Sequence, residues 1–495
     1  MLISILILLA FTVRFAYFVG GIRGVDAFAY ALSAHDIMTG QYDVNSITTF
    51  YGFRYILLLP TALSYMLFGV NDISSSLFPF LCSLLNIAAL FLIGEKIFNW
   101  KVALIGSVLL IFYPLDIISA SLLGPDSCIP LFSSLAVLCY LTAEEKRTPD
   151  RSAKRALLYI AAGLFIALAI SARLTSIFLY GVLILNQIRK PRWRSSLLWI
   201  SVGLVIPLFV ESIYYYLSTG DPIFSIHRVA SLEVTVKGDA PHAIVSLWFY
   251  PLAMLGFDIT GLASFGFIWW LTMAGLLLAW FKKEGKLLFP ALWLVLPFCG
   301  FEFGTQSLKE LIPIMKNYNY LSLTTTPAML ISAYFLEKIT SSFFRTNDKK
   351  KLSLLILILF SISCVNLYGA YRLYLIYAND AAPYVAVAHV LKQSPRHTIY
   401  IHHDRWSLFL KYFLKYDPSF AFRTMDDLTH NELENISNAY VVLHKRHLEA
   451  DTPGRALSQL PFYAHYMDKP PHKWERLLSF EGKPKYNNVV LYYIP

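Results

Sequence analysis

The stretch MLISILILLAFTVRFAYFVGGIRGVDAFAYALSAHD, residues 1–36, decides how the rest of the chain is interpreted. Residues 1–19 are mostly apolar and have about the length of a helix that crosses a bilayer. They lack a basic start and a small-residue cleavage site, so we predict a retained membrane helix and not a cleaved signal peptide. Asp26 follows just outside this helix, at the start of a second helix with an apolar face. A carboxylate in that place either caps the helix or serves chemistry at the membrane surface.

The composition of the whole chain indicates a polytopic membrane protein. Of its 495 residues 56% are hydrophobic and 15% are charged, and apolar runs of about 16 to 25 residues recur along it. The net charge of +10 does not indicate nucleic acid, because Lys and Arg gather in short loops between apolar runs and there set membrane orientation. The five cysteines lie in or beside apolar segments at spacings that predict neither a disulfide framework nor a zinc site.

Basic loops mark the side of the membrane that we predict to be cytoplasmic. These loops are 95–101, 144–155, 189–194, 282–286 and 337–351. The apolar runs that alternate with them are 73–93, 102–123, 127–143, 156–172, 174–188, 196–217, 260–281, 287–303, 320–336 and 352–377. With residues 1–19 they predict about eleven crossings of the cell (inner or plasma) membrane, with the N-terminus in the cytoplasm.

One more apolar run, FRYILLLPTALSYMLFG at 53–69, is predicted to lie along the outer membrane interface without crossing. The run is short, carries Pro60 in its middle and follows a polar loop. A crossing here would also place the basic loop 95–101 outside, against the charge rule. The outer loops that follow from this topology are 20–72, 218–259 and 304–319.

The tail, residues 378–495, differs from the helical part at 1–377. Helix-like stretches (PYVAVAHVLKQS, WSLFLKYFLKY) alternate in it with strand-like ones (HTIYIHH, AYVVLHKRH, NNVVLYYIP). This pattern predicts a small α/β domain, which the topology puts on the extracytoplasmic side. The predicted fold is therefore an α-helical polytopic membrane domain followed by a small C-terminal α/β domain.

Two aspartates are the leading candidates for chemistry. Asp26 could act as a general base at the membrane surface, or only cap its helix. Asp126, in LLGPDSCIP, lies at the outer junction of two predicted helices, where an ionisable group is a site hypothesis, although the same residues can start the next helix. Asp116, earlier in the same region, is predicted to face the same interior.

Cations in or next to the predicted outer loops form a complementary set. They are Arg14, Arg54, Arg173, His227, Arg228, Lys309 and Lys316. Snorkelling to the lipid headgroups explains any one of them. Their gathering on one face beside carboxylates favours binding of an anionic lipid phosphate. The sequence contains no phosphate-binding loop, dinucleotide fingerprint or serine nucleophile motif, which disfavours nucleotide chemistry.

In order along the chain, several segments resemble those of the GT-C glycosyltransferases that use polyprenyl-phosphate sugars, in the branch of protein O-mannosyltransferases and lipid A aminoarabinose transferases. GGIRGVDAFAYALSAHDIMTGQYD is similar to the family's first outer loop, and FYPLDIISASLLGPDSCIPLFSSLAVL to its pattern of Pro, spacer and Asp. ALAISARLTSIFLY resembles a Leu-Thr-Arg segment, YYYLSTGDPIFSIHRV a Gly-Asp-Pro entry, and MKNYNYLSLTTTPAMLISAY an Arg-Tyr-x-x-x-x-x-Pro segment. The chain departs from the family at Ala27, where many relatives have a second acidic residue, and at Asn317, where Arg is usual.

The resemblance implies an enzyme that moves a sugar from a polyprenyl-phosphate donor to an acceptor hydroxyl, on a glycan, lipid or protein, with inversion. It implies Asp26 as the catalytic base and Asp126 as a second catalytic group that positions donor or acceptor. It implies Arg54, Arg173 and Lys316 as partners of the donor phosphate. His227, Arg228, Lys309 and Tyr318, in or next to the predicted outer loops, are further candidates for binding the donor. A lone acidic residue in the first loop gives no indication of a divalent metal, so no cofactor is expected. The alternatives are a lipid-linked saccharide flippase and a glycan polymerase or ligase.

Overall fold

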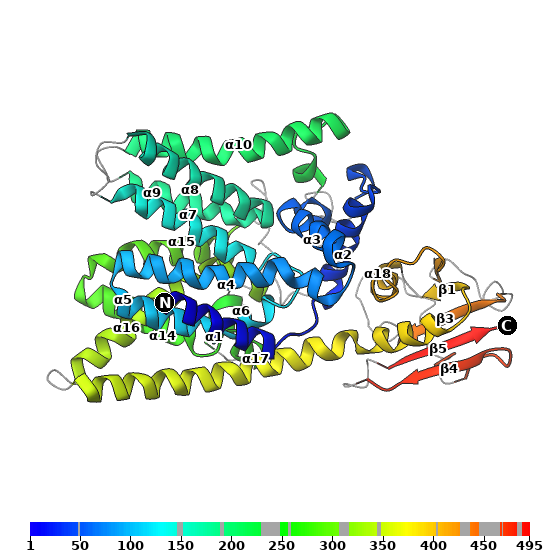
Figure 1. Ribbon diagram of the computed structural model, residues 1–495. Coiled ribbons are helices and arrows are strands. Elements are labelled where there is room, and N and C mark those ends of the chain that lie inside the picture. The colour runs from blue at the N-terminus through cyan, green and yellow to red at the C-terminus, as the bar shows by residue number, and fades with distance from the viewer. Residues whose placement is uncertain are drawn as a thin grey trace.

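The computed structural model describes residues 1–47, 50–145, 152–188, 193–228, 248–255, 259–305, 316–343, 348–401, 404–425, 436–444, 466–467, 469–482 and 488–495. The molecule is elongated, with a bundle of helices at one end and a small sheet at the other, and α17 (Asp348–Gln393) runs along both parts (Figure 1). The structure therefore contains the two parts that the sequence predicts.

The bundle is built from apolar helices that match the predicted apolar runs, with one exception at 249–254, which lies in the predicted outer loop 218–259. Besides the first part of α17 they are α1 (Leu2–Ala16), α4 (Asp72–Ile97), α5 (Trp100–Ile111), α6 (Pro114–Ser119), α7 (Cys128–Glu144), α8 (Ser152–Ala172), α9 (Phe178–Gln187), α10 (Trp193–Thr219), α12 (Phe249–Met254), α13 (Ile259–Phe265), α14 (Ile268–Lys282), α15 (Leu288–Phe303) and α16 (Thr325–Phe343). The predicted runs 102–123 and 260–281 each contain two helices. Among the described residues, five helices are long and apolar enough to cross a membrane, and six shorter helices are also apolar. The chain is a multi-pass membrane protein, and the number of crossings stays a prediction.

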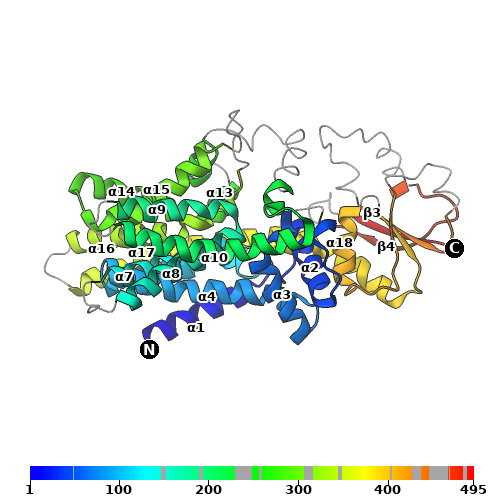
Figure 2. The same cartoon turned by 90° about the horizontal axis from the view of Figure 1, so that it is seen from above.

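Polar contacts connect the helices at one end of the bundle. At the end where the chain begins, Lys96 pairs with Glu145, and Glu144 accepts hydrogen bonds from Tyr159 and from Gln187. These contacts tie together the ends of α4, α7, α8 and α9. The C-terminal sheet lies at the opposite end of the molecule from the N-terminus (Figure 2). The described residues of the predicted cytoplasmic loops 95–101 and 144–155 therefore lie at the opposite end of the molecule from the sheet.

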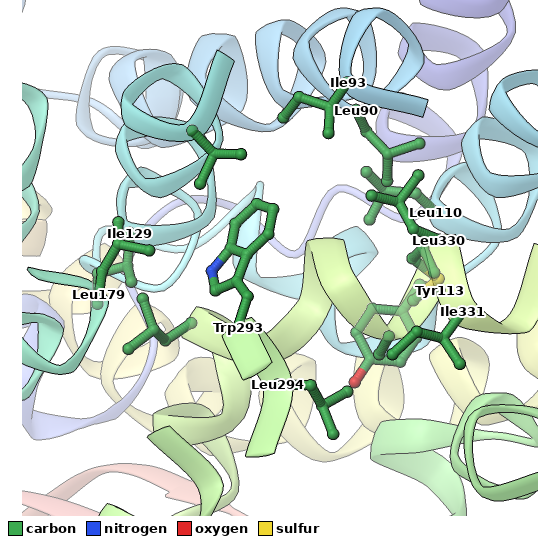
Figure 3. Packing of buried hydrophobic residues seen from close by; sticks show 14 of the residues in the cluster. Leu90, Ile93, Leu110, Tyr113, Ile129, Leu179, Trp293, Leu294, Leu330 and Ile331 are labelled. Carbon is green, nitrogen blue, oxygen red and sulfur yellow. The ribbon is translucent and has the colours of Figure 1, made fainter. Parts of the chain in front are cut away.

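Apolar packing fills the bundle between these ends. Trp293 of α15 is completely buried, and Ile129, Leu179 and Leu330 from three other helices belong to the same apolar cluster (Figure 3). Close approach of helices depends on glycine where α8 meets α10. A Cβ atom at Gly163 would lie 1.9 Å from the Ile200 carbonyl oxygen. Small residues of this kind let membrane helices pack backbone to backbone.

Two helices of the first outer loop, α2 (Gly24–Thr39) and α3 (Tyr55–Phe68), lie between the bundle and the sheet (Figures 1 and 2). The loop also contains the 3-10 turns η1 (Val44–Ser46) and η2 (Phe50–Phe53). With 14 residues, α3 is about 21 Å long, which is short of the roughly 30 Å of bilayer hydrocarbon. Length alone does not distinguish α3 from α1, which has 15 residues and is predicted to cross, so the position of α3 along the interface stays a prediction.

The C-terminal part contains a five-stranded sheet with the order β2-β1-β3-β5-β4. Its elements are β1 (Thr398–Ile401), α18 (Asp404–Phe413), β2 (Phe422–Thr424), β3 (Ala439–His444), β4 (Glu475–Phe480) and β5 (Val489–Ile494). β1 pairs in parallel with β2 and β3, whereas β5 is antiparallel to β3 and β4. The sequence predicts β1, β3 and β5 but misses β2 and β4. α17 passes residue 377 without a break, so one helix belongs to both predicted domains.

Candidate active site

Asp26 lies in the first turn of α2, but it is not the cap of that helix. The capping position belongs to Arg23, whose extended backbone precedes Gly24. The Asp26 carboxylate is exposed and accepts a hydrogen bond of 2.5 Å from the Tyr51 hydroxyl. The helix dipole favours a negative charge in this turn. Of the two sequence interpretations, capping by the side chain is therefore wrong, and a role at the membrane surface stays a prediction.

A tyrosine pair connects Asp26 to Arg54. The rings of Tyr51 and Tyr30 meet edge to face with centroids 5.2 Å apart, and the Arg54 guanidinium donates to the Tyr30 hydroxyl. Arg54 stands at the cap of α3. Burial, together with the positive charge of Arg173, lowers the pKa of Arg54 to about 10. Arg54 therefore keeps its positive charge at neutral pH.

Asp126 and Arg173 form an ion pair at the same end of the bundle. Arg173 Nη2 lies 2.6 Å from Asp126 Oδ1, and Arg173 Nη1 donates to the Asn319 carbonyl oxygen at 2.9 Å. The guanidinium also lies over the Tyr320 ring, 4.6 Å from its centroid. These partners come from the turn before α7, the turn η3 (Leu174–Ile177) and the turn η6 (Tyr318–Thr324). Arg173 Nε is buried and has no hydrogen-bond partner among the described residues.

Backbone contacts hold the Asp26 loop against the Asp126 loop. The Gly21 amide donates to the Ser121 carbonyl, and the Leu123 amide donates to the Gly21 carbonyl. Gly21 has a φ of +68°, and a Cβ atom there would lie 2.2 Å from the Asp72 carbonyl oxygen. Only glycine meets both requirements without strain. This contact places the start of α2 beside the start of α7.

Electrostatic neighbours show that these groups share one region. The charges of Asp26, Asp126 and Arg173 all act on Arg54. Those of Asp26, Asp126 and Asp380 act on the hydroxyl of Tyr377, which α17 delivers to the same place. The structure therefore brings together four sequence candidates, Asp26, Asp126, Arg54 and Arg173.

Sequence reasoning missed several members of this region, namely Tyr51, Tyr30, Tyr320, Tyr377 and Asp380. A tyrosine where an apolar run ends is usually an interface anchor, so Tyr377 gives no distinct signal in the sequence. We found no sequence signal for the others.

Most of the remaining candidates have partners elsewhere. Lys316 forms a buried ion pair of 2.7 Å with Glu302, and His227 lies 2.7 Å from Asp221 at the surface. Arg228 donates to the Ile47 carbonyl oxygen, and Tyr318 packs against Phe249 and Phe265. Arg14 and Asp116 pair with each other inside the bundle. Lys309 lies outside the described residues.

Glu302 is a partner that sequence analysis did not identify. Its carboxylate also accepts hydrogen bonds from the Trp248 and Tyr250 amides, and the Tyr250 hydroxyl donates to the Asn317 carbonyl. Glu302 and Lys316 therefore fix the segment that leads to Asn319 and Tyr320, which contact Arg173. No group of three or more His, Cys, Asp and Glu suited to a metal ion occurs in the part of the chain that the structure describes.

Comparisons with known proteins identify the fold. A family model described as dolichyl-phosphate-mannose-protein mannosyltransferase matches residues 57–215. No curated protein sequence matches the chain at a significant level. The chain is similar to ArnT from Cupriavidus metallidurans bound to undecaprenyl phosphate, with a TM-score of 0.65 and 14% identity over 99% of this chain and 97% of that one.

Two further structures have the same architecture. Apo ArnT from Cupriavidus metallidurans gives a TM-score of 0.59 with 15% identity over 99% of this chain and 97% of that chain. The Archaeoglobus fulgidus oligosaccharyltransferase tethered with an acceptor peptide gives 0.56 with 10% identity over 90% and 69%, respectively. The chain therefore has the GT-C glycosyltransferase fold with a small C-terminal sheet domain, as the sequence predicts.

Proposed function

We propose that the protein transfers a sugar from a polyprenyl-phosphate donor to an acceptor hydroxyl at the end of the bundle that holds Asp26. The observation that carries the proposal is the gathering of an exposed carboxylate, held by Tyr51, with Arg54 and the Asp126–Arg173 pair. Carboxylate and guanidinium groups suit the two halves of this reaction, which are proton removal and departure of a phosphate. The fold supports the proposal, because a GT-C relative binds undecaprenyl phosphate.

In the proposed reaction the acceptor oxygen attacks the anomeric carbon while Asp26 takes the hydroxyl proton. A new bond between carbon and the acceptor oxygen forms, and the bond from the same carbon to the phosphate oxygen breaks. The bonding electrons leave with the polyprenyl phosphate, whose negative charge grows. Arg54 and Arg173 stabilise that charge. Attack from the side opposite the leaving phosphate inverts the configuration at the sugar.

The remaining expectations belong to the same proposal. The positive-inside rule puts the N-terminus in the cytoplasm and the site on the extracytoplasmic side of the cell membrane. The acceptor is a glycan, a lipid or a protein, and no metal ion takes part. His227, Arg228, Lys309, Lys316 and Tyr318 stay proposed donor contacts, of which Lys316 is the weakest because Glu302 already neutralises it.

The test is transfer by the purified protein in lipid vesicles. Polyprenyl phosphates that carry different radiolabelled sugars are supplied with glycan, lipid and peptide acceptors. We expect labelled acceptor and released polyprenyl phosphate in equal amounts for one combination. Movement of intact donor between leaflets without product would instead support the flippase. Polymerised product from a lipid-linked glycan would support the polymerase.

A labelling experiment tests the proposed membrane position of α3. Single cysteines at Ser46 and Asn71, exposed positions before and after α3, should both react with a membrane-impermeant reagent added from outside. Reaction of Asn71→Cys only from the cytoplasmic side would show that α3 crosses the membrane.

A further inference from the structure

Helix α18 of the C-terminal part packs directly on the helix that carries Asp26. Phe28, two residues after Asp26, lies with its ring centroid 3.9 Å from that of Phe409 and 5.7 Å from that of Tyr412. One turn beyond α18, the Tyr416 ring stacks on His35 at 4.2 Å. Phe28 and Phe409 are both buried. The face of α2 that starts beside Asp26 is therefore covered by the C-terminal part of the chain.

Polar contacts attach α18 to the start of α4, beside the cap of α2. The Tyr412 hydroxyl donates to Asp72 Oδ1 at 3.0 Å and shares a hydrogen bond of 2.9 Å with the Ser75 hydroxyl. Arg23, the cap of α2, lies beside Asp72. Burial lowers the pKa of Arg23, and the charge of Asp72 opposes that shift. Tyr412 thus joins α18 to the beginning of α4 by hydrogen bonds and to α2 by its ring contact with Phe28.

We propose that α18 positions Asp26, with Phe409 and Tyr412 as positioning residues for the proposed transfer. This inference rests on the proposed function. Asp26 lies three residues after Arg23, whose side chain is beside Asp72, and two residues before Phe28, which packs on Phe409. α3 and Tyr51 hold α2 from the other side. A displacement of about 1 Å at a catalytic group can lower a rate by roughly a hundredfold, so the fit of α18 against α2 sets the rate.

The first experiment compares kinetic constants of Phe409→Ala and Tyr412→Phe with a matched control. Trp474→Ala removes an aromatic side chain of similar burial in the same domain, where it packs on Tyr466 and Tyr492. We expect Phe409→Ala to lower kcat by about tenfold with donor KM within about twofold, and Phe409→Leu to restore part of the loss. The control should keep kcat even if it lowers stability equally. Equal kcat losses in Phe409→Ala and the control would overturn the proposal.

The second experiment needs no transfer activity. In a background where the native cysteines are replaced, the reaction rate of Asp26→Cys with a soluble thiol reagent reports the position of residue 26. We expect this rate to change severalfold when Phe409→Ala is added and to stay constant with Trp474→Ala. A constant rate in both would overturn the positioning role. A changed rate, together with a parent protein that transfers no sugar in the vesicle assay, would refute the proposed function and leave the positioning role standing.

Discussion

Two arginine–aspartate pairs in the same bundle differ in how completely they are enclosed. Arg14 and Asp116 have side chains with 0% and 4% exposure, and Asp116 also accepts a hydrogen bond of 2.6 Å from Ser83. Arg173 and Asp126 have 10% and 13% exposure and lie among Arg54, Tyr320 and Tyr377. The polar groups of the first pair are hydrogen-bonded to each other and to Ser83. In the second pair a buried donor, Arg173 Nε, has no partner among the described residues.

The comparison shows that an ion pair inside a membrane protein is not by itself a site. A sequence rule marks every intramembrane charge as a functional hypothesis, and both pairs satisfy it equally. Access and remaining hydrogen-bonding capacity distinguish them. We therefore expect Arg14 and Asp116 to contribute to stability, and the region of Arg173 and Asp126 to serve the proposed chemistry.

The largest effect on transfer should come from Asp26, which lies in the same region as the Arg173–Asp126 pair. We expect Asp26→Asn to lower transfer by roughly a hundredfold or more, because the amide cannot accept the acceptor proton. Activity is measured as labelled product from a polyprenyl-phosphate sugar. Asp36→Asn, on the same helix, is the control and should stay within about threefold. Activity of Asp26→Asn within the same range would remove Asp26 from the mechanism.

Substitution of Arg14 should mainly lower stability, whereas substitution of Arg173 should mainly lower transfer. Arg14→Met leaves Asp116 buried without its partner, so the free energy of unfolding in detergent should fall by about 3–5 kcal/mol. Arg173→Met should lower transfer by about tenfold or more with a smaller loss of stability, because its pair is partly accessible. The assay pairs thermal unfolding with product formation. An Arg173 variant that is fully active yet unstable would reverse our assignment.

Replacing both members of the enclosed pair sharpens the comparison. Arg14→Met combined with Asp116→Leu removes the unpaired charge, so the stability should return close to that of the parent. The transfer activity of this double variant should likewise return close to that of the parent. Low transfer in a stable double variant would show that the enclosed pair also serves the reaction.

A smaller effect is expected at Tyr51, which orients Asp26 through one hydrogen bond. Tyr51→Phe should lower kcat by roughly 3- to 10-fold, in line with about 1 kcal/mol for such a bond. Tyr180→Phe removes a hydroxyl that bonds Ser201 in the bundle and should leave kcat unchanged. An unchanged kcat in Tyr51→Phe would mean that Asp26 is oriented by other groups.

Removal of metal ions should leave transfer unchanged. We expect transfer to be the same with and without a strong chelator, because guanidinium groups supply the positive charge at the proposed site. Loss of product with chelator, and its return with added Mg²⁺ or Mn²⁺, would introduce a metal into the reaction.

The sequence predicts the elements with strong apolar patterns and misses those without them. β1, β3 and β5 are apolar runs at the centre of the sheet, whereas the missed strands β2 and β4 are its two edges. β4, ERLLSF, is mostly exposed, so its pattern lacks the apolar signal of a central strand. Most bundle helices are predicted for the same reason, since each must present an apolar surface to lipid or to its neighbours, whereas the short helix α12 is missed.

The sequence predicts which charged residues belong to the site, but not which residues they contact. Asp26, Asp126, Arg54 and Arg173 are identifiable as charges at the ends of apolar runs. Their partners come from distant segments, so spacing gives no access to them. Lys316 illustrates the limit, because its partner Glu302 is hidden at the end of an apolar helix and neutralises it in the fold.

The contact between α18 and the start of the bundle also has a consequence in time. Ser75 and Tyr412, which share a hydrogen bond, are 337 residues apart. At about 5–20 residues per second, a ribosome adds Tyr412 roughly 17–67 s after Ser75. Throughout that interval α2 is already made, and the ring of Phe28 has no Phe409 to pack against. A chain that stops early therefore carries Asp26 on a helix with one side uncovered, and only the finished chain assembles the whole site.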